Sequence, residues 1–89
     1  MFKINNDFVL RRINGHNLVI PTGKRIKDFQ GALVLNETGV LIYEQLQHKK
    51  TITEIVEILI SEYDTNIENA KKDVEKFIEL LKEAGVLIE

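Results

Sequence analysis

Cysteine is absent from the 89 residues of this chain. Its absence excludes a disulfide framework, a thiolate nucleophile and a cysteine metal site, and it makes a reducing cytoplasm the expected compartment. Long apolar runs are absent as well: no segment reaches the length that spans a bilayer, and the first residues lack the apolar core of a signal peptide. We therefore expect neither secretion nor insertion into a membrane.

An excess of charge of one sign is also missing. The 12 Lys and Arg residues stand against 14 Asp and Glu residues, which gives a formal net charge of −2 at pH 7. Because the basic residues are scattered along the chain, no broad positive field exists to attract phosphate backbones. Nucleic acid is therefore not expected as a partner.

Groups for catalysis or metal binding are scarce. The only two imidazoles, His16 and His48, lie by a predicted turn and at a basic helix end. Neither has a nucleophile or a set of further ligands at a suitable spacing, and the glycines form no phosphate-binding loop. The sequence therefore predicts no catalytic residues, no metal site and no cofactor.

The composition is that of one soluble globular domain. The apolar fraction is 44% and the charged fraction is 29%, which argues against a disordered chain. A domain of this length buries about 60 to 65% of the surface of its unfolded chain. We therefore expect residues 1–89 to form a single domain around one modest core.

A β-hairpin is predicted near the N-terminus. Two apolar and β-branched runs, Phe8 to Ile13 and His16 to Ile20, are separated by Asn14-Gly15, the dipeptide that best tolerates a type I′ turn. Pro21 cannot donate a ladder hydrogen bond and is expected to end the second strand. With a two-residue loop, one face carries Val9, Arg11, Ile13, His16, Leu18 and Ile20, and the other carries Phe8, Leu10, Arg12, Asn17 and Val19.

Neither face of this hairpin is cleanly polar. The pattern has two interpretations: a small sheet with something packed partly over each side, or a register that differs by one residue. A third strand is predicted from Ala32 to Leu35, with Gly31 either a bulge or a place where another backbone comes close. The polar segment from Lys24 to Asp28 receives no assignment.

Two helices follow the third strand, and each begins at a capping residue. Asn36 is a good N-cap for a helix from about Glu37 to Gln47, and Glu37 places negative charge at the positive end of the helix dipole. Thr51 and Glu54 have the spacing of a capping box, which opens a second helix that runs to about Tyr63.

A third helix is predicted after Thr65 or Asn66, both competent caps, and it ends at Gly85. Its apolar residues recur with the 3.6-residue period of a helix packed on a core: Ile67, Ala70, Val74, Phe77, Ile78, Leu81 and Ala84. The segment Val86 to Ile88 either returns to the sheet or covers the core. Together these elements predict an α+β fold, a three-stranded antiparallel sheet followed by three helices, winged-helix-like in arrangement.

A winged-helix-like arrangement raises the alternative of a DNA-binding or regulatory protein. Such a protein needs a recognition helix rich in Arg, Lys, Asn or Gln on one exposed face. The predicted second helix has no Lys or Arg, and the third alternates charges of both signs. The sequence therefore argues against a recognition helix that binds in a groove of DNA.

A series of short motifs follows the hairpin. In order they are Asp28-Phe29-x-Gly31, Leu35-Asn36-Glu37-Thr38-Gly39, Tyr63-Asp64, Asp73-Val74-x-x-Phe77-Ile78-x-x-Leu81 and Gly85. Each motif is weak by itself, but their order and spacing together span nearly the whole chain. In this respect the sequence resembles the PqqD family, the stand-alone recognition elements of pathways that modify ribosomally made precursor peptides.

The resemblance implies a non-catalytic peptide-binding domain. A domain of this family binds the leader segment of a precursor peptide as a strand added beside the third strand, in a groove bounded by the third helix. It then presents the precursor to a modifying enzyme, such as a radical S-adenosylmethionine protein or a leader peptidase. The domain itself is expected to be a monomer or a weak dimer. Carried over to this chain, the implied peptide-binding residues are Gly31, Ala32, Leu33, Val34, Leu35, Lys71, Val74, Glu75 and Ile78.

Two further interpretations stay open. The apolar residues among those implied for the site can equally be plain core, which would leave them no part in binding. The chain can also be a small structural subunit whose apolar edge is buried in a permanent protein complex.

Overall fold

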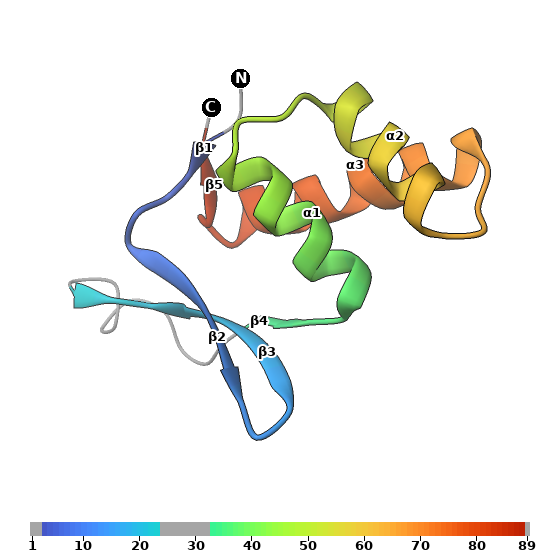
Figure 1. Cartoon of the computed structure of the whole chain (residues 1–89). Coiled ribbons are helices and arrows are strands. Elements are labelled where there is room, and N and C mark those ends of the chain that lie inside the picture. The colour runs from blue at the N-terminus through green and yellow to red at the C-terminus, as the bar shows by residue number, and fades with distance from the viewer. Residues whose placement is uncertain (1–2, 24–32, 89) are drawn as a thin grey trace.

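The computed structural model describes residues 3–23 and 33–88, which form five strands and three helices (Figure 1). The strands are β1 (Lys3–Ile4), β2 (Phe8–Ile13), β3 (His16–Pro21), β4 (Leu33–Leu35) and β5 (Leu87–Ile88). The helices are α1 (Glu37–Gln47), α2 (Ile52–Glu62) and α3 (Ile67–Glu83). The predicted α+β fold, a three-stranded antiparallel sheet followed by three helices, is confirmed.

The predicted hairpin and its register are confirmed. Asn14 and Gly15 adopt the positive φ angles, 51° and 80°, that a type I′ turn needs, and they place Ile13 opposite His16. The third predicted strand, β4, pairs antiparallel with β3, so the sheet has the order β2-β3-β4. In this register Phe8 and Val19 are buried on the same face of the sheet. A shift by one residue is thereby excluded.

The helices begin where the capping residues predict. The Asn36 side chain accepts a hydrogen bond of 2.8 Å from the Gly39 N–H. Thr51 and Glu54 form the full capping box: the Glu54 N–H donates to Oγ1 of Thr51 at 3.2 Å, and the Thr51 N–H donates to Oε1 of Glu54 at 2.9 Å. The hydrogen bond from the Thr51 N–H is the main cause that lowers the pKa of the Glu54 carboxyl. Of the two candidate caps for the third helix, Asn66 is the one that serves.

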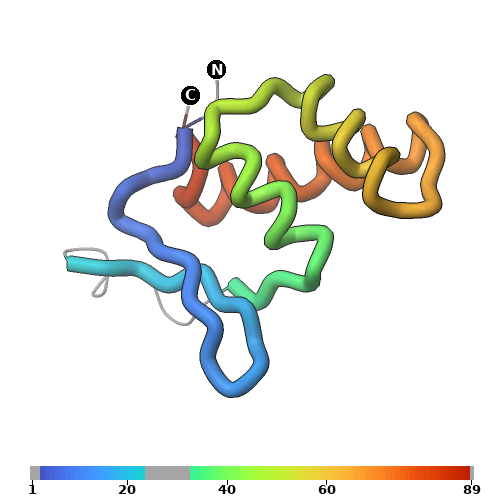
Figure 2. The backbone as a smooth tube through the Cα atoms, in the orientation of Figure 1, coloured from blue at the N-terminus to red at the C-terminus, as the bar shows by residue number. Residues whose placement is uncertain are grey.

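One core joins the sheet to the helices. The helices lie on one side of the three-stranded sheet (Figure 2), and the buried residues of β2, β3 and β4 belong to the same cluster as those of α1, α2 and α3. Tyr43 of α1 is completely buried, and its hydroxyl has no hydrogen-bond partner among the residues that the structure describes. Burial of the Tyr43 hydroxyl raises its pKa above the ordinary value of 10.0.

A second, two-stranded sheet joins the two ends of the chain. β1 pairs antiparallel with β5, with Ile4 opposite Leu87. Asn5 reinforces the pair, because its N–H donates to the Val86 carbonyl at 2.7 Å and its side-chain amide donates to the Gly85 carbonyl at 3.0 Å. The sequence did not predict β1. For the last residues the sequence left two possibilities, that they return to the three-stranded sheet or that they cover the core. In the structure they form a separate sheet with β1, and Leu87 is buried in the core.

Candidate functional site

Among the described residues, β4 is one of the two edge strands of the three-stranded sheet. Within the described residues it pairs with β3 on one side only. β2 forms the opposite edge, but it carries Arg11 and Arg12, and charged side chains are a common protection of an edge strand. β4 has no charged residue, and its central residue, Val34, is 68% exposed. Its unprotected edge is therefore the more suitable of the two for pairing with another chain.

The turn from β4 into α1 is packed tightly against α3. Gly39, in the first turn of α1, is buried and has no room for a side chain. A Cβ placed there would lie 3.2 Å from Cε1 of Phe77, 3.3 Å from Cβ of Leu35 and 3.4 Å from Oδ1 of Asn36. The missing side chain of Gly39 thus lets the Phe77 ring of α3 approach the end of β4.

A groove opens beside this contact, between the first half of α1 and the middle of α3. We call it the β4–α3 groove, because its lining includes Asn36, the residue that directly follows β4. Its volume is about 350 Å³. Two apolar side chains of α3 contribute to its lining, the half-buried Phe77 and the exposed Leu80. Two charged side chains, Asp73 and Lys76, also line it. The described residues that line it are Asn36, Thr38, Gly39, Ile42, Asp73, Lys76, Phe77 and Leu80.

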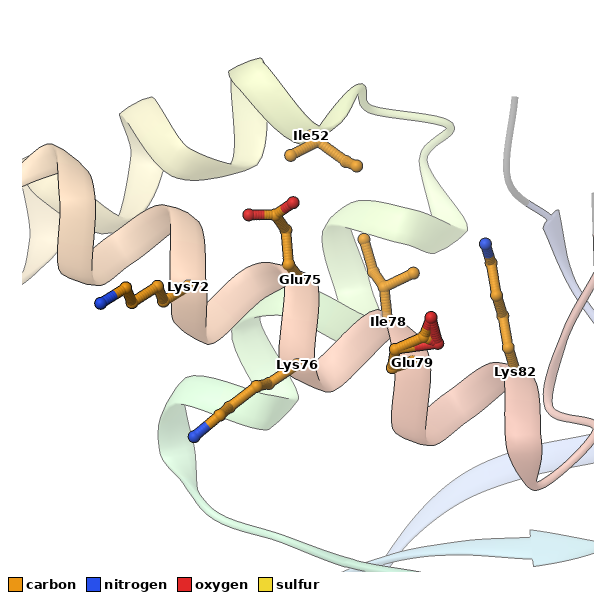
Figure 3. Close-up of a pocket in the computed structure, with 7 residues that line it drawn as sticks. All are labelled: Ile52, Lys72, Glu75, Lys76, Ile78, Glu79 and Lys82. Atoms are coloured by element: carbon orange, nitrogen blue, oxygen red, sulfur yellow. The ribbon is translucent and has the colours of Figure 1, made fainter.

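A second hollow lies on the other flank of α3, between that helix and the start of α2. Its volume is about 470 Å³, and its lining includes Ile52, Glu75 and Ile78 (Figure 3). Four further charged residues complete the lining: Lys72, Lys76, Glu79 and Lys82. In Figure 3 Glu75 points toward Ile52 of α2. The described residues that line this hollow all belong to α2 and α3.

The structure brings together only part of the predicted strand site. Leu33, Val34 and Leu35 form β4, with Leu33 half-buried and Leu35 buried. Gly31 and Ala32 lie outside the described residues. The strand part of the predicted site is thus described for three residues.

The predicted residues of the third helix lie in two different environments. Val74 and Ile78 are buried in the core. Lys71 and Glu75 are exposed, and neither lines the β4–α3 groove; Glu75 instead lines the hollow beside α2. Contact of these residues with a peptide stays a prediction.

Sequence reasoning missed the residues of α3 that do line the groove. Asp73 and Phe77 belong to the motif that carried the resemblance, but they were not named as site residues. On a helix each residue advances by 100°, so Asp73, Phe77 and Leu80 share one flank of α3. Lys71 and Glu75 share the opposite flank. The available signal was an apolar Leu80 outside the core stripe, which marks the flank that faces the groove.

The described part of the chain contains neither a cluster of metal ligands nor a helix that could span a membrane. Residues 3–23 and 33–88 contain no group of three or more His, Asp or Glu side chains placed to hold a metal ion. No helix within these ranges has both the length and the apolar character needed to cross a membrane.

Comparison with known proteins gives the same family as the motifs. The sequence profile described as "Coenzyme PQQ synthesis protein D (PqqD)" matches residues 18–87. No curated protein matches the chain at a significant level.

Solved structures with a similar fold include one described as "Lasso peptide synthetase B1 complexed with the leader peptide". It has a TM-score of 0.83 and 19% sequence identity, over 99% of this chain and 98% of that chain. Another is "TbiB1 in Complex with the TbiA(beta) Leader Peptide", with a TM-score of 0.78 and 21% identity, over 96% and 93% of the two chains. At these identities the likeness concerns the fold alone. The family profile, however, spans most of the sequence, and on that ground the chain belongs to the PqqD family.

Proposed function

We propose that this protein is a non-catalytic module that binds the leader segment of a ribosomally synthesised precursor peptide. The observation that carries the proposal is the uncharged strand β4, whose last residue, Leu35, is followed directly by Asn36, a lining residue of the β4–α3 groove. Membership of the PqqD family supports it. Two proteins of similar fold, both described as bound to a leader peptide, support it as well.

Strand addition fits the geometry of this edge. A leader paired with β4 forms main-chain hydrogen bonds, which provide affinity for any extended peptide. Its side chains alternate between the two faces of the sheet. Those that face the helices meet the β4–α3 groove, where Phe77 and Leu80 accept apolar groups and Asp73 and Lys76 accept polar or charged ones. Alternate leader positions therefore determine specificity.

The module would then present the precursor to a separate modifying enzyme. The described lining of the groove comes from the N-cap and the first two turns of α1 and from α3, and these residues include no nucleophile paired with a base. Chemistry on the precursor is accordingly assigned to the partner, for which a radical S-adenosylmethionine protein or a leader peptidase are the two classes expected from the family.

The DNA-binding alternative gains no support from the structure. α2 contains no Lys or Arg and has three exposed Glu residues, Glu54, Glu57 and Glu62. A helix with this surface is repelled by a phosphate backbone and offers no bidentate donor for guanine.

The proposal is tested by titration of the labelled protein with a synthetic leader peptide of a candidate precursor. We expect the largest changes of backbone amide shifts in Leu33–Leu35 and around Phe77 and Leu80, because a new strand changes their hydrogen bonding and packing directly. α2 should change little. The largest shifts in Ile52–Glu62, with β4 unaffected, would contradict strand addition at this edge.

A pair of variants tests the groove. Leu80 is 45% exposed, and complete burial of a Leu side chain stabilises by roughly 1.5 to 3 kcal/mol. Covering the exposed part by a leader side chain is then worth about 1 kcal/mol, so Leu80→Ala should weaken leader binding by about fivefold. Ile67→Ala is the matched control, because Ile67 is exposed at the start of α3 and lies outside the groove. Equal losses in both variants would show that the groove is not used.

A further inference from the structure

The three-stranded sheet has one face turned to the helices and one turned away from them. Consecutive residues of a strand point to opposite faces, and residues that are paired across neighbouring strands point to the same face. On the inner face Phe8, Val19 and Leu35 are buried in the core. We call the opposite side the outer face; its apolar residues are Val9, Ile13, Leu18, Ile20 and Val34.

The outer face is unusually apolar for a surface that no described helix covers. A sheet with one side in water normally alternates apolar residues inward with polar residues outward. Here five β-branched or Leu side chains occupy outward positions of three short strands, and Val34 and Ile13 are both exposed. Val9, Leu18 and Ile20 are half-buried. Apolar side chains gathered on one uncovered face favour an interaction site in a soluble protein.

One positive charge lies within this apolar surface. Arg11 of β2 is the cross-strand neighbour of Leu18, whose other neighbour is Val34, so the three residues form one row across the sheet. Arg11 is exposed, and its guanidinium reaches no carboxylate that the structure describes; its Nη1 donates to the carbonyl of Leu10 at 3.2 Å. A guanidinium in apolar surroundings favours a carboxylate as its partner.

The outer face is continuous with the proposed leader site. Val34 lies on β4, and a leader strand paired with β4 would run about 4.8 Å away from it. The leader side chains that do not enter the β4–α3 groove would then extend the row of Arg11, Leu18 and Val34 by one strand. Domain and leader would together present a single four-stranded surface.

We infer that the outer face is the docking surface for the enzyme that acts on the leader-bound precursor. The inference rests on the proposed leader binding. It adds that the enzyme docks on the outer face and that the docking surface of the enzyme is apolar and carries a carboxylate opposite Arg11. Because the leader supplies the outermost strand of this surface, the enzyme binds the loaded domain more tightly than the free domain. By linkage, the enzyme raises the affinity for the leader by the same factor.

The experiment uses the full chain, its precursor peptide and the modifying enzyme from the same gene cluster. Affinity for the enzyme is measured with the domain saturated by leader, and leader affinity is measured separately. Ile13→Ser should weaken enzyme binding by about tenfold and leave leader affinity unchanged, because Ile13 is on the outer face and away from β4. Ile67→Ser, which also alters an exposed Ile but on α3, is the control and should change neither affinity.

Two consecutive arginines test the charge with an internal control. Arg11 and Arg12 are neighbours on β2, both are exposed, and they point to opposite faces of the sheet. Arg11→Glu should weaken enzyme binding at least about tenfold, with the effect reduced at high salt, whereas Arg12→Glu should have a much smaller effect. Equal effects of the two reversals would indicate a diffuse field and overturn the inference.

Two more outcomes decide against the outer face. If the wild-type protein sediments as a dimer that Ile13→Ser converts to a monomer, a second copy of the chain covers the face and the inference is wrong. If Ile13→Ser and Ile67→Ser behave alike toward the enzyme, the enzyme docks elsewhere. In both cases leader binding by the wild-type protein is intact, whereas absence of leader binding would refute the proposed function itself.

Discussion

Substitution of Gly39 by Ala tests the packing that brings α3 to the end of β4. In a helix Ala is favoured over Gly by about 0.8 to 1.0 kcal/mol. At this position, however, the new methyl would lie 3.2 Å from Cε1 of Phe77 and 3.3 Å from Cβ of Leu35. The first atom is at the end of a side chain, but the second is fixed to the backbone of β4, so the contact cannot be relieved by a rotamer change alone.

Overpacking of this kind costs about 1 to 3 kcal/mol. After the gain in helix propensity we expect a net loss of about 1 kcal/mol for Gly39→Ala, which lowers the midpoint of thermal unfolding by about 4 to 8 °C in a domain of this size. Displacement of Phe77 also widens the β4–α3 groove, so leader affinity should fall. Thermal unfolding followed by circular dichroism measures the first effect and calorimetric titration measures the second.

A double-mutant cycle isolates the cause. Phe77→Leu removes the ring atom that the new methyl meets, so Gly39→Ala should cost at least about 0.5 kcal/mol less in that background than in the wild type. If Gly39→Ala instead raises the unfolding midpoint, or if the two substitutions are additive, the contact between Gly39 and Phe77 does not constrain the groove.

Two titratable groups give further predictions. Tyr43→Phe removes a buried hydroxyl that has no partner among the described residues, so the stability of the variant at pH 7 should equal that of the wild type or exceed it by about 1 kcal/mol. Burial raises the pKa of Tyr43, so in alkaline melts the wild type should lose more stability than the variant as the pH rises above 10.0. Glu54→Gln keeps an acceptor for the Thr51 N–H but no charge; since the Glu54 pKa is lowered, acid melts should show wild-type stability falling below pH 4.5 more steeply than that of the variant. Parallel pH profiles of wild type and variant would count against either argument.

Local signals predicted most of the fold. Asn14-Gly15 determined the hairpin turn, and the capping residues Asn36 and Thr51 marked the starts of α1 and α2. These signals work because each depends on residues within a few positions of one another. The pairing of β1 with β5 has no such signal, since each strand has two residues and the partners lie at opposite ends of the sequence. Neither periodicity nor turn chemistry predicts a contact of that kind.

The helical side of the candidate site shows a second limit of the sequence. The 3.6-residue period correctly assigned Val74 and Ile78 to the buried stripe of α3. It does not say which flank of that stripe turns toward β4, because the two flanks are equivalent in a periodic pattern. The choice between Lys71 and Leu80 depends on how α3 is rotated against α1, and that rotation is determined by the contact of Phe77 with Gly39.

The short pairing of β1 with β5 also bears on the order in which the domain folds and opens. Asn5 and Gly85, joined by a side-chain hydrogen bond, are 80 positions apart, whereas the hairpin and the packing of α2 on α3 connect segments that follow one another in the chain. The entropy cost of closing a loop rises with its length, so these terminal strands pair after the local elements have formed. Ile4, Val86 and Leu87 are nevertheless buried in the core. Separation of the two ends would therefore also uncover the side of the core that these residues close.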